Sequence, residues 1–197
     1  MFFVTKPSPE EIARFISSRR ELPFSYPEVG ATGREPPAGY TVDHNRIRLG
    51  TGEEVYERAI AALKNWKQFD LGWVRMVPSG TPIETGAIVA ILTRHFGFWS
   101  LNGCRVVYLI SEDGAERKFG FAYGTLSSHV ERGEERFTIE WHKSDDSVWY
   151  DILAFSRPNQ VLVKLGFPLA RMLQKRFARD SLATMVRVSQ PGLHRKG

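Results

Sequence analysis

The strongest constraint on the fold comes from six β-rich runs that follow one another between positions 72 and 155. Each run is rich in β-branched or aromatic residues, and short turn-like segments separate it from the next. The runs are GWVRMV, AIVAILTRHF, CRVVYLI, KFGFAYGTL, ERFTIEWH and SVWYDILAF, and the turns are PSGTP, GFWSLNG, SEDGAE, SSHVERGE and KSDD. This pattern predicts an antiparallel sheet.

One run shows how this sheet is oriented. In ERFTIEWH the residues Phe137, Ile139 and Trp141 fall on one face, because successive side chains of a strand point to opposite sides. Arg136, Thr138, Glu140 and His142 fall on the other face. The alternation predicts a sheet with one packed side and one side that meets water or a polar cavity.

The period changes after Pro158. Leu165, Leu169, Leu173 and Phe177 recur every four residues, with Leu162 and Met172 on the same stripe, which indicates a long amphipathic helix towards Met185. Pro168 either kinks this helix or begins its second half. It is the only element long enough to cover the sheet, and a curved sheet around it would enclose a cavity.

The N-terminal part begins with a helix near Ile12, which Ser8 caps and Pro9 starts, followed by a long Pro/Gly-rich connection. A strand from Tyr40 and a helix over residues 53–66 precede the sheet. We therefore divide the chain into an N-terminal segment (1–39) packed on the main domain, an α+β domain (40–187) and a flexible basic tail (188–197).

Composition narrows the function classes. The net charge is +5 and charged residues make up 25% of the chain, values common among soluble proteins that bind neither nucleic acid nor membranes. The single cysteine, Cys104, lies in an apolar run, which predicts a buried, inert thiol and excludes a multi-cysteine metal site. We expect no metal, no cofactor and no nucleic-acid partner. We also expect a cytoplasmic location, because no signal peptide or membrane-length apolar stretch is present.

Several long phrases resemble a family of bacterial and plant proteins of unknown function. They are YPEVGAT, PPAGYTVDHNRIRLGTGEEVYERA, FGFAYGTLSSHVERGEERF and SVWYDILAFSRPNQVLVKLGFPLARMLQKRFARDSLATM, and they extend from Tyr26 to Met185. The resemblance extends to the helix-grip superfamily of lipid-transfer domains, polyketide cyclases and pollen-allergen-like proteins. It implies a curved antiparallel sheet that grips a long C-terminal helix around an apolar cavity. The N-terminal helix and connection precede the usual first strand, and whether they cover the cavity mouth stays open.

The stretch GFAYGTLSSHVERGEERF (120–137) allows two interpretations. His129, Glu131, Glu134 and Glu135 could form a metal or acid–base cluster, or the stretch could be a β-hairpin with a polar turn. A single turn rarely supplies the geometry of a metal site, so we favour the hairpin. Glu134 and Glu135 are adjacent, so at most one of them enters the concave face.

The expected function is binding of a small apolar or amphipathic ligand in the internal cavity, with the oligomeric state left open. Candidate ligand-binding residues are Tyr26, Tyr123, Trp149 and Arg157. An alternative is an enzyme of the helix-grip cyclase or hydrolase type that uses His129 or a cavity carboxylate, either Glu140 or Asp151. We expect a binding protein rather than an enzyme.

A third interpretation is a protein-interaction module, which would present the acidic hairpin or a basic row on the last helix. Arg171, Lys175 and Arg179 form this row at spacings of four, and it could also touch an anionic membrane surface. Arg176 and Asp180, also four apart, are expected to form an ion pair with a structural role.

Overall fold

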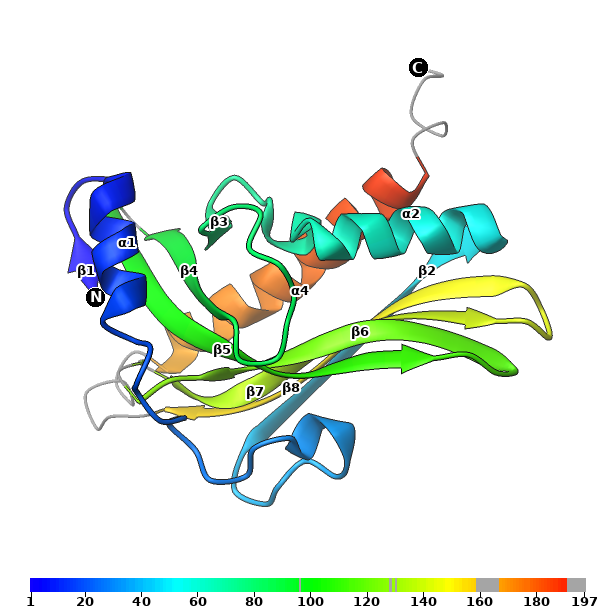
Figure 1. Cartoon of the computed structure of the whole chain (residues 1–197), viewed down its shortest axis with the longest axis horizontal. Helices are drawn as coiled ribbons and strands as arrows, with labels where there is room; N and C mark the ends of the chain where they lie inside the picture. The colour runs from blue at the N-terminus through cyan, green and yellow to red at the C-terminus, as the bar shows by residue number, and fades with distance from the viewer. Residues whose placement is uncertain (96, 128, 130, 159–166, 191–197) are drawn as a thin grey trace.

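The computed structural model describes residues 1–95, 97–127, 129, 131–158 and 167–190 (Figure 1). Its elements follow the expected order of a strand, a helix, six strands and a C-terminal helix, with short additions near the N-terminus. They are β1 (Phe2–Phe3), α1 (Pro9–Ser17), η1 (Ala31–Gly33), β2 (Thr41–Thr51), α2 (Glu53–Lys64), η2 (Lys67–Phe69), β3 (Val74–Val77), β4 (Ile88–His95), β5 (Phe98–Glu112), β6 (Glu116–Thr125), β7 (Glu131–His142), β8 (Ser147–Pro158) and α4 (Phe167–Ser189).

All strands belong to one antiparallel sheet. Its order is β2-β8-β7-β6-β5-β4-β3, and β1 pairs with β5 beside this path. Figure 1 shows the sheet curling, with α2 and α4 on one side of it and η1 on the opposite side. This is the arrangement that the resemblance to the helix-grip superfamily implies. We call the face towards α4 the inner face and the opposite face the outer face.

The strand alternation is confirmed by the core. Phe137, Ile139, Tyr150 and Ile152 are all at most 1% exposed and pack in the main hydrophobic cluster on the inner face. Along α4, the Phe177 ring lies 5.1 Å from the Phe69 ring of η2, measured between centroids. Aromatic packing of this kind contributes beyond simple area burial.

Polar contacts also hold α4 against its neighbours. Ser181 and Tyr150 hydroxyl oxygens lie 3.1 Å apart, and the Trp73 indole N–H donates to Asp180 Oδ2 at 3.0 Å. The expected Arg176–Asp180 ion pair is present at 3.4 Å. These contacts fix the rotation of the helix and thereby select which of its side chains face the sheet.

Apart from Phe2 of β1, which lines the cavity described below, the N-terminal segment packs on the outer face. Ser8 caps α1 in a reciprocal capping box with Glu11, as the sequence predicts. Phe15 of α1 packs with Leu92 and Leu101, whereas Tyr26 of the connection packs with Phe155. Both contacts lie behind the sheet, so α1 and the connection leave the inner face uncovered.

Two predicted turns are shorter than expected. Residues 98–103 of the GFWSLNG segment are part of β5, because His95 pairs with Phe98 and Phe2 of β1 pairs with Ser100. The strand β7 begins at Glu131, which pairs with Pro158, so the turn after β6 is also brief. The predicted helix residues Leu162 and Leu165 and tail residues 191–197 lie outside the described residues.

The basic row on the last helix needs correction. Lys175 and Arg179 are exposed, but Arg171 turns towards β2, where its Nη2 donates to Asp43 Oδ1 at 2.6 Å. The row is therefore not a uniform solvated stripe. Among the described residues, no helix is both long enough and apolar enough to cross a lipid bilayer.

Candidate ligand cavity

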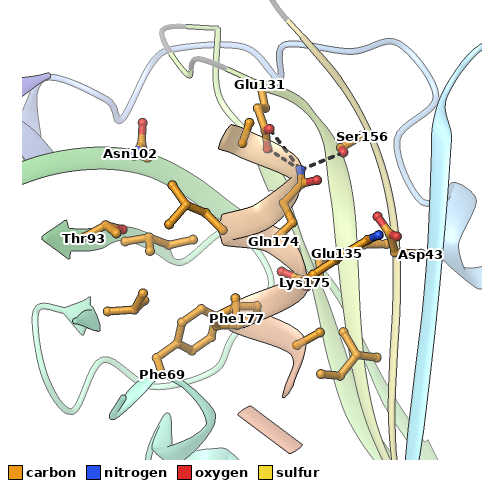
Figure 2. A pocket seen from close by; sticks show the side chains of 18 of the residues that line it. Asp43, Phe69, Thr93, Asn102, Glu131, Glu135, Ser156, Gln174, Lys175 and Phe177 are labelled. Atoms are coloured by element: carbon orange, nitrogen blue, oxygen red, sulfur yellow. Dashed lines mark hydrogen bonds between the residues drawn. The ribbon is translucent and has the colours of Figure 1, made fainter. Parts of the chain in front are cut away.

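A cavity of about 790 Å³ lies between the inner face of the sheet and α4 (Figure 2). Volumes of several hundred cubic ångströms are typical of small-molecule sites. Its walls come from strands at both ends of the sheet and from the segment 170–183 of α4. The core between sheet and helix is therefore hollow at this point and not filled by the chain's own side chains.

One part of the cavity is apolar. Phe69 and Trp73 line it from the segment between α2 and β3, and Ile91 lines it from β4. Phe177 and Leu182 of α4 face these residues and are only half-buried, because part of their surface borders the cavity. Figure 2 shows Phe69 and Phe177 side by side at this wall.

The polar side is organised around Gln174 of α4. Its amide Nε2 donates to both carboxylate oxygens of Glu131, each at 2.9 Å, and to Ser156 Oγ at 3.1 Å (Figure 2). Burial raises the pKa of Glu131, whereas the Gln174 hydrogen bonds and the Arg171 charge oppose this rise. One glutamine thus joins β7, β8 and α4 at the edge of the cavity.

Glu135, on the same face of β7 as Glu131, is the most perturbed carboxyl group of the cavity. Burial raises its pKa from 4.5 to about 7, and the charges of Glu131 and Asp43 act in the same direction. The Tyr123 hydroxyl donates to Glu135 Oε2 at 2.5 Å, which opposes the rise. The half-buried side chain lines the cavity, so near neutral pH this carboxyl can hold or release a proton there.

His129 completes the polar part of the lining and is 9% exposed. Its Nδ1 accepts a hydrogen bond from the Glu131 backbone N–H at 3.0 Å, which assigns the proton of the neutral ring to Nε2. Burial lowers the His129 pKa to about 4. The imidazole is therefore neutral at pH 7 and adds no positive charge to the cavity.

Comparison with known proteins now places the chain. A family model described as "Domain of unknown function (DUF1990)" matches residues 25–184. The chain belongs to the DUF1990 family. A UPF0548 protein of Dictyostelium discoideum is 42% identical over 206 residues, covering 95% of each protein. A UPF0548 protein of Deinococcus radiodurans is 38% identical over 203 residues, covering 96% of this chain and 99% of that one.

A solved structure shares the fold of this DUF1990 protein. The hypothetical protein jhp0584 from Helicobacter pylori superposes with a TM-score of 0.50 at 12% sequence identity. The match covers 85% of this chain and 96% of the other. At this level of identity the similarity concerns the fold alone.

The structure of the DUF1990 chain separates the predicted site residues into two groups. Tyr123 and His129 line the cavity. Tyr26, Trp149 and Arg157 belong to the outer face and are not part of the lining. The Tyr26 hydroxyl donates to Glu134 Oε2 at 2.7 Å, whereas Arg46 stacks on Trp149 and Arg157 stacks on Tyr40.

The two carboxylates that we considered for catalysis also lie on the outer face. Glu140 accepts a hydrogen bond from Arg46 Nη2 at 2.6 Å. Asp151 lies 2.5 Å from His44 Nε2 and 3.2 Å from Arg136 Nη2. The strand alternation turns both side chains away from α4, so neither is a cavity carboxylate.

The favoured interpretation of the stretch 120–137 as a hairpin is confirmed, since β6 and β7 pair from Glu116↔His142 to Gly124↔Glu134. Both Glu134 and Glu135 border the cavity, but the Glu134 carboxylate turns to the outer face, where the backbone N–H groups of Gly30 and Thr32 donate to it at 2.7 and 2.9 Å. The sequence analysis placed Glu131 and Glu135 in a possible turn cluster and allowed either Glu134 or Glu135 to enter the concave face, but it did not single out Asp43 or Gln174. The available signal was the position of Glu135 on the apolar face of its strand.

Proposed function

We propose that this DUF1990 protein binds a small amphipathic molecule in the cavity between the sheet and α4. The observation that carries the proposal is the cavity itself, about 790 Å³ with an aromatic wall and a polar side. Burial of apolar ligand surface against Phe69, Trp73 and Phe177 would drive binding, at about 25 cal/mol per Å² of buried surface. The polar side chains would orient the ligand. If the apolar part of the ligand lay against them instead of its polar group, their hydrogen-bonding groups would be left unpaired.

A fluorescence titration with N-phenyl-1-naphthylamine, an apolar and uncharged probe, tests this proposal. Ala154 of β8 and Ala170 of α4 line opposite walls of the cavity. Ala154→Phe and Ala170→Phe should each weaken probe binding about tenfold, because the added ring occupies ligand space and removes apolar contact area. Ala115→Phe, at an exposed turn residue, is the matched control and should bind as the wild type does.

The proposal fails if the wild-type protein binds no probe, or if both cavity variants bind it unchanged. Thermal unfolding of each variant establishes that it is folded, and two variants on different walls protect the test against the misfolding of one. Native mass spectrometry of gently purified protein provides a separate readout, since a retained small molecule appears as a discrete added mass.

A second candidate function is general acid–base catalysis in the same cavity. It is favoured by Glu135, because a carboxyl with a pKa of about 7 can accept and return a proton near neutral pH. Incubation with metabolite extracts, followed by mass spectrometry, tests this candidate. A compound consumed by the wild type and spared by Glu135→Gln supports catalysis, whereas identical profiles for both proteins oppose it.

A further inference from the structure

We propose that the polar group of the cavity ligand is a cationic hydrogen-bond donor, an amine joined to an apolar chain or ring, and that Glu135 receives it. This inference rests on the proposed function and specifies its ligand class. It follows from the balance of charges that face the polar side of the cavity, together with the half-buried position of Glu135, a carboxyl with no lysine or arginine nitrogen within 4.0 Å among the described residues.

Three carboxyl groups lie at this side of the cavity, and among the described residues Asp43 is the one of them that forms an ion pair. Asp43 comes from β2, and Glu131 and Glu135 come from β7. Arg171 is bound to Asp43 through both of its terminal nitrogens, so its charge is directed to that partner. Gln174 supplies Glu131 with neutral donors only.

Glu135 is the carboxyl that a ligand cation can best satisfy. Among the described residues, its hydrogen bond comes from the neutral Tyr123 hydroxyl, and no lysine or arginine nitrogen lies within 4.0 Å of it. The negative charges of Glu131 and Asp43 both disfavour its ionisation. A cation placed beside Glu135 would form a charge-assisted hydrogen bond with it and would also be attracted by Glu131.

The remaining titratable groups do not reverse this balance. Lys175 and Arg179 also border the cavity, but both are exposed and therefore hydrated. Burial lowers the pKa values of His95 and His129, so both imidazoles are neutral at pH 7. A carboxylate or phosphate ligand would approach buried carboxyl groups of its own sign, which disfavours anionic amphiphiles.

Three amphiphiles with the same chain test the inference: dodecylamine, dodecanol and dodecanoate. Each competes with N-phenyl-1-naphthylamine for the wild type, for Glu135→Gln and for the control Glu112→Gln. Glu112 is an exposed residue of β5, so its substitution removes the same charge without touching the cavity.

At pH 8 we expect dodecylamine to bind the wild type about tenfold more tightly than dodecanoate. Glu135→Gln should weaken dodecylamine about tenfold, which is the size expected for one charge-assisted hydrogen bond. The same variant should leave dodecanol within about twofold and bind dodecanoate more tightly. Wild-type affinity for the amine should rise between pH 6 and pH 8 as Glu135 ionises, whereas the variant should show no such rise.

Two patterns overturn the inference. In the first, dodecanoate binds the wild type as tightly as the amine does. In the second, Glu135→Gln leaves amine binding unchanged. If the probe and dodecanol bind under either pattern, cavity binding stands and only the amine preference fails. If the probe and all three amphiphiles fail to bind, the proposed function fails as well.

Discussion

Replacing Glu135 with glutamine should stabilise the protein at alkaline pH. Glutamine has nearly the same shape as glutamate, and its carbonyl oxygen can still accept the hydrogen bond from Tyr123. The substitution therefore removes one ionisable group from the cavity while the packing of β7 stays the same. The effect on stability depends on pH, because only the wild type has to ionise a buried carboxyl.

The pKa of Glu135 sets the magnitude. It is about 7 in the folded protein, compared with an ordinary value of 4.5 that we take for the unfolded chain. The folded state therefore binds this proton more tightly than the unfolded state, and the stabilisation it provides is complete below pH 4.5 and lost as pH rises through 7. The loss amounts to about 3 kcal/mol, at 1.36 kcal/mol for each tenfold change in the proton dissociation constant.

Urea denaturation of both proteins at several values between pH 4.5 and pH 8.5 measures this effect. The free energies of unfolding should agree to within about 0.5 kcal/mol at pH 4.5, and the Glu135→Gln variant should be more stable by about 3 kcal/mol at pH 8.5. Glu112→Gln should differ from the wild type by less than about 0.5 kcal/mol throughout, as expected for an exposed position. A Glu135→Gln effect that is independent of pH, or destabilising at pH 8.5, would refute the assignment of Glu135 as a carboxyl held mainly protonated by burial.

Three further predictions concern the remaining buried groups. Glu134→Gln should lower the free energy of unfolding by about 3 kcal/mol, because an amide N–H₂ replaces an acceptor that faces the donors of Tyr26, Gly30 and Thr32; urea denaturation measures the loss. Gly124→Ala should cost about 1–3 kcal/mol by calorimetry, because a Cβ there would overlap the Tyr26 hydroxyl, and an unchanged melting temperature would contradict this. Cys104 is 0% exposed and burial raises the pKa of its thiol, so intact-mass analysis should find iodoacetamide labelling only after unfolding.

Much of the fold was predictable because its elements have distinct periods. The alternation in β7 indicated which residues would be buried, and the four-residue spacing of Leu173 and Phe177 indicated the final helix. The short strand β1 was not predictable, since two residues carry no period. The start of β5 at Phe98 was also missed, because the segment GFWSLNG has the composition of a turn. In the structure this segment pairs with β4 on one side and with β1 on the other.

The site was less predictable, because strand alternation separates two faces without saying which one meets the cavity. In β8 each face carries a large aromatic residue, and the sequence analysis chose Trp149 as a cavity residue, whereas Tyr150 is the one that faces α4. In β7 the pattern was more informative. Glu140 shares the polar face, whereas Glu135 shares the face of Phe137, and a carboxylate among apolar residues marks a special position.

Contacts across long sequence separations could not be predicted at all. Asp43 and Arg171 are 128 residues apart, and their pairing depends on how α4 is rotated against β2. Gln174 reaches Glu131 for the same reason. The rotation is fixed by partners such as Asp180 and Trp73, which no local pattern reveals.

Glu135 differs from the other buried or half-buried carboxyl groups that have structural partners, and the difference supports a ligand on the inner side of the sheet. On the outer face, Glu134 is bound by backbone N–H groups and Asp151 by a guanidinium, so each charge has a structural partner. On the inner face, Glu135 has a neutral hydroxyl partner and costs stability when it ionises. Glutamine could keep that hydrogen bond without this cost, so packing alone does not account for a carboxyl at this position. A bound cation would account for it. In the empty protein, ionising Glu135 near neutral pH lowers the free energy of unfolding, and the charge of a bound cation would offset that loss.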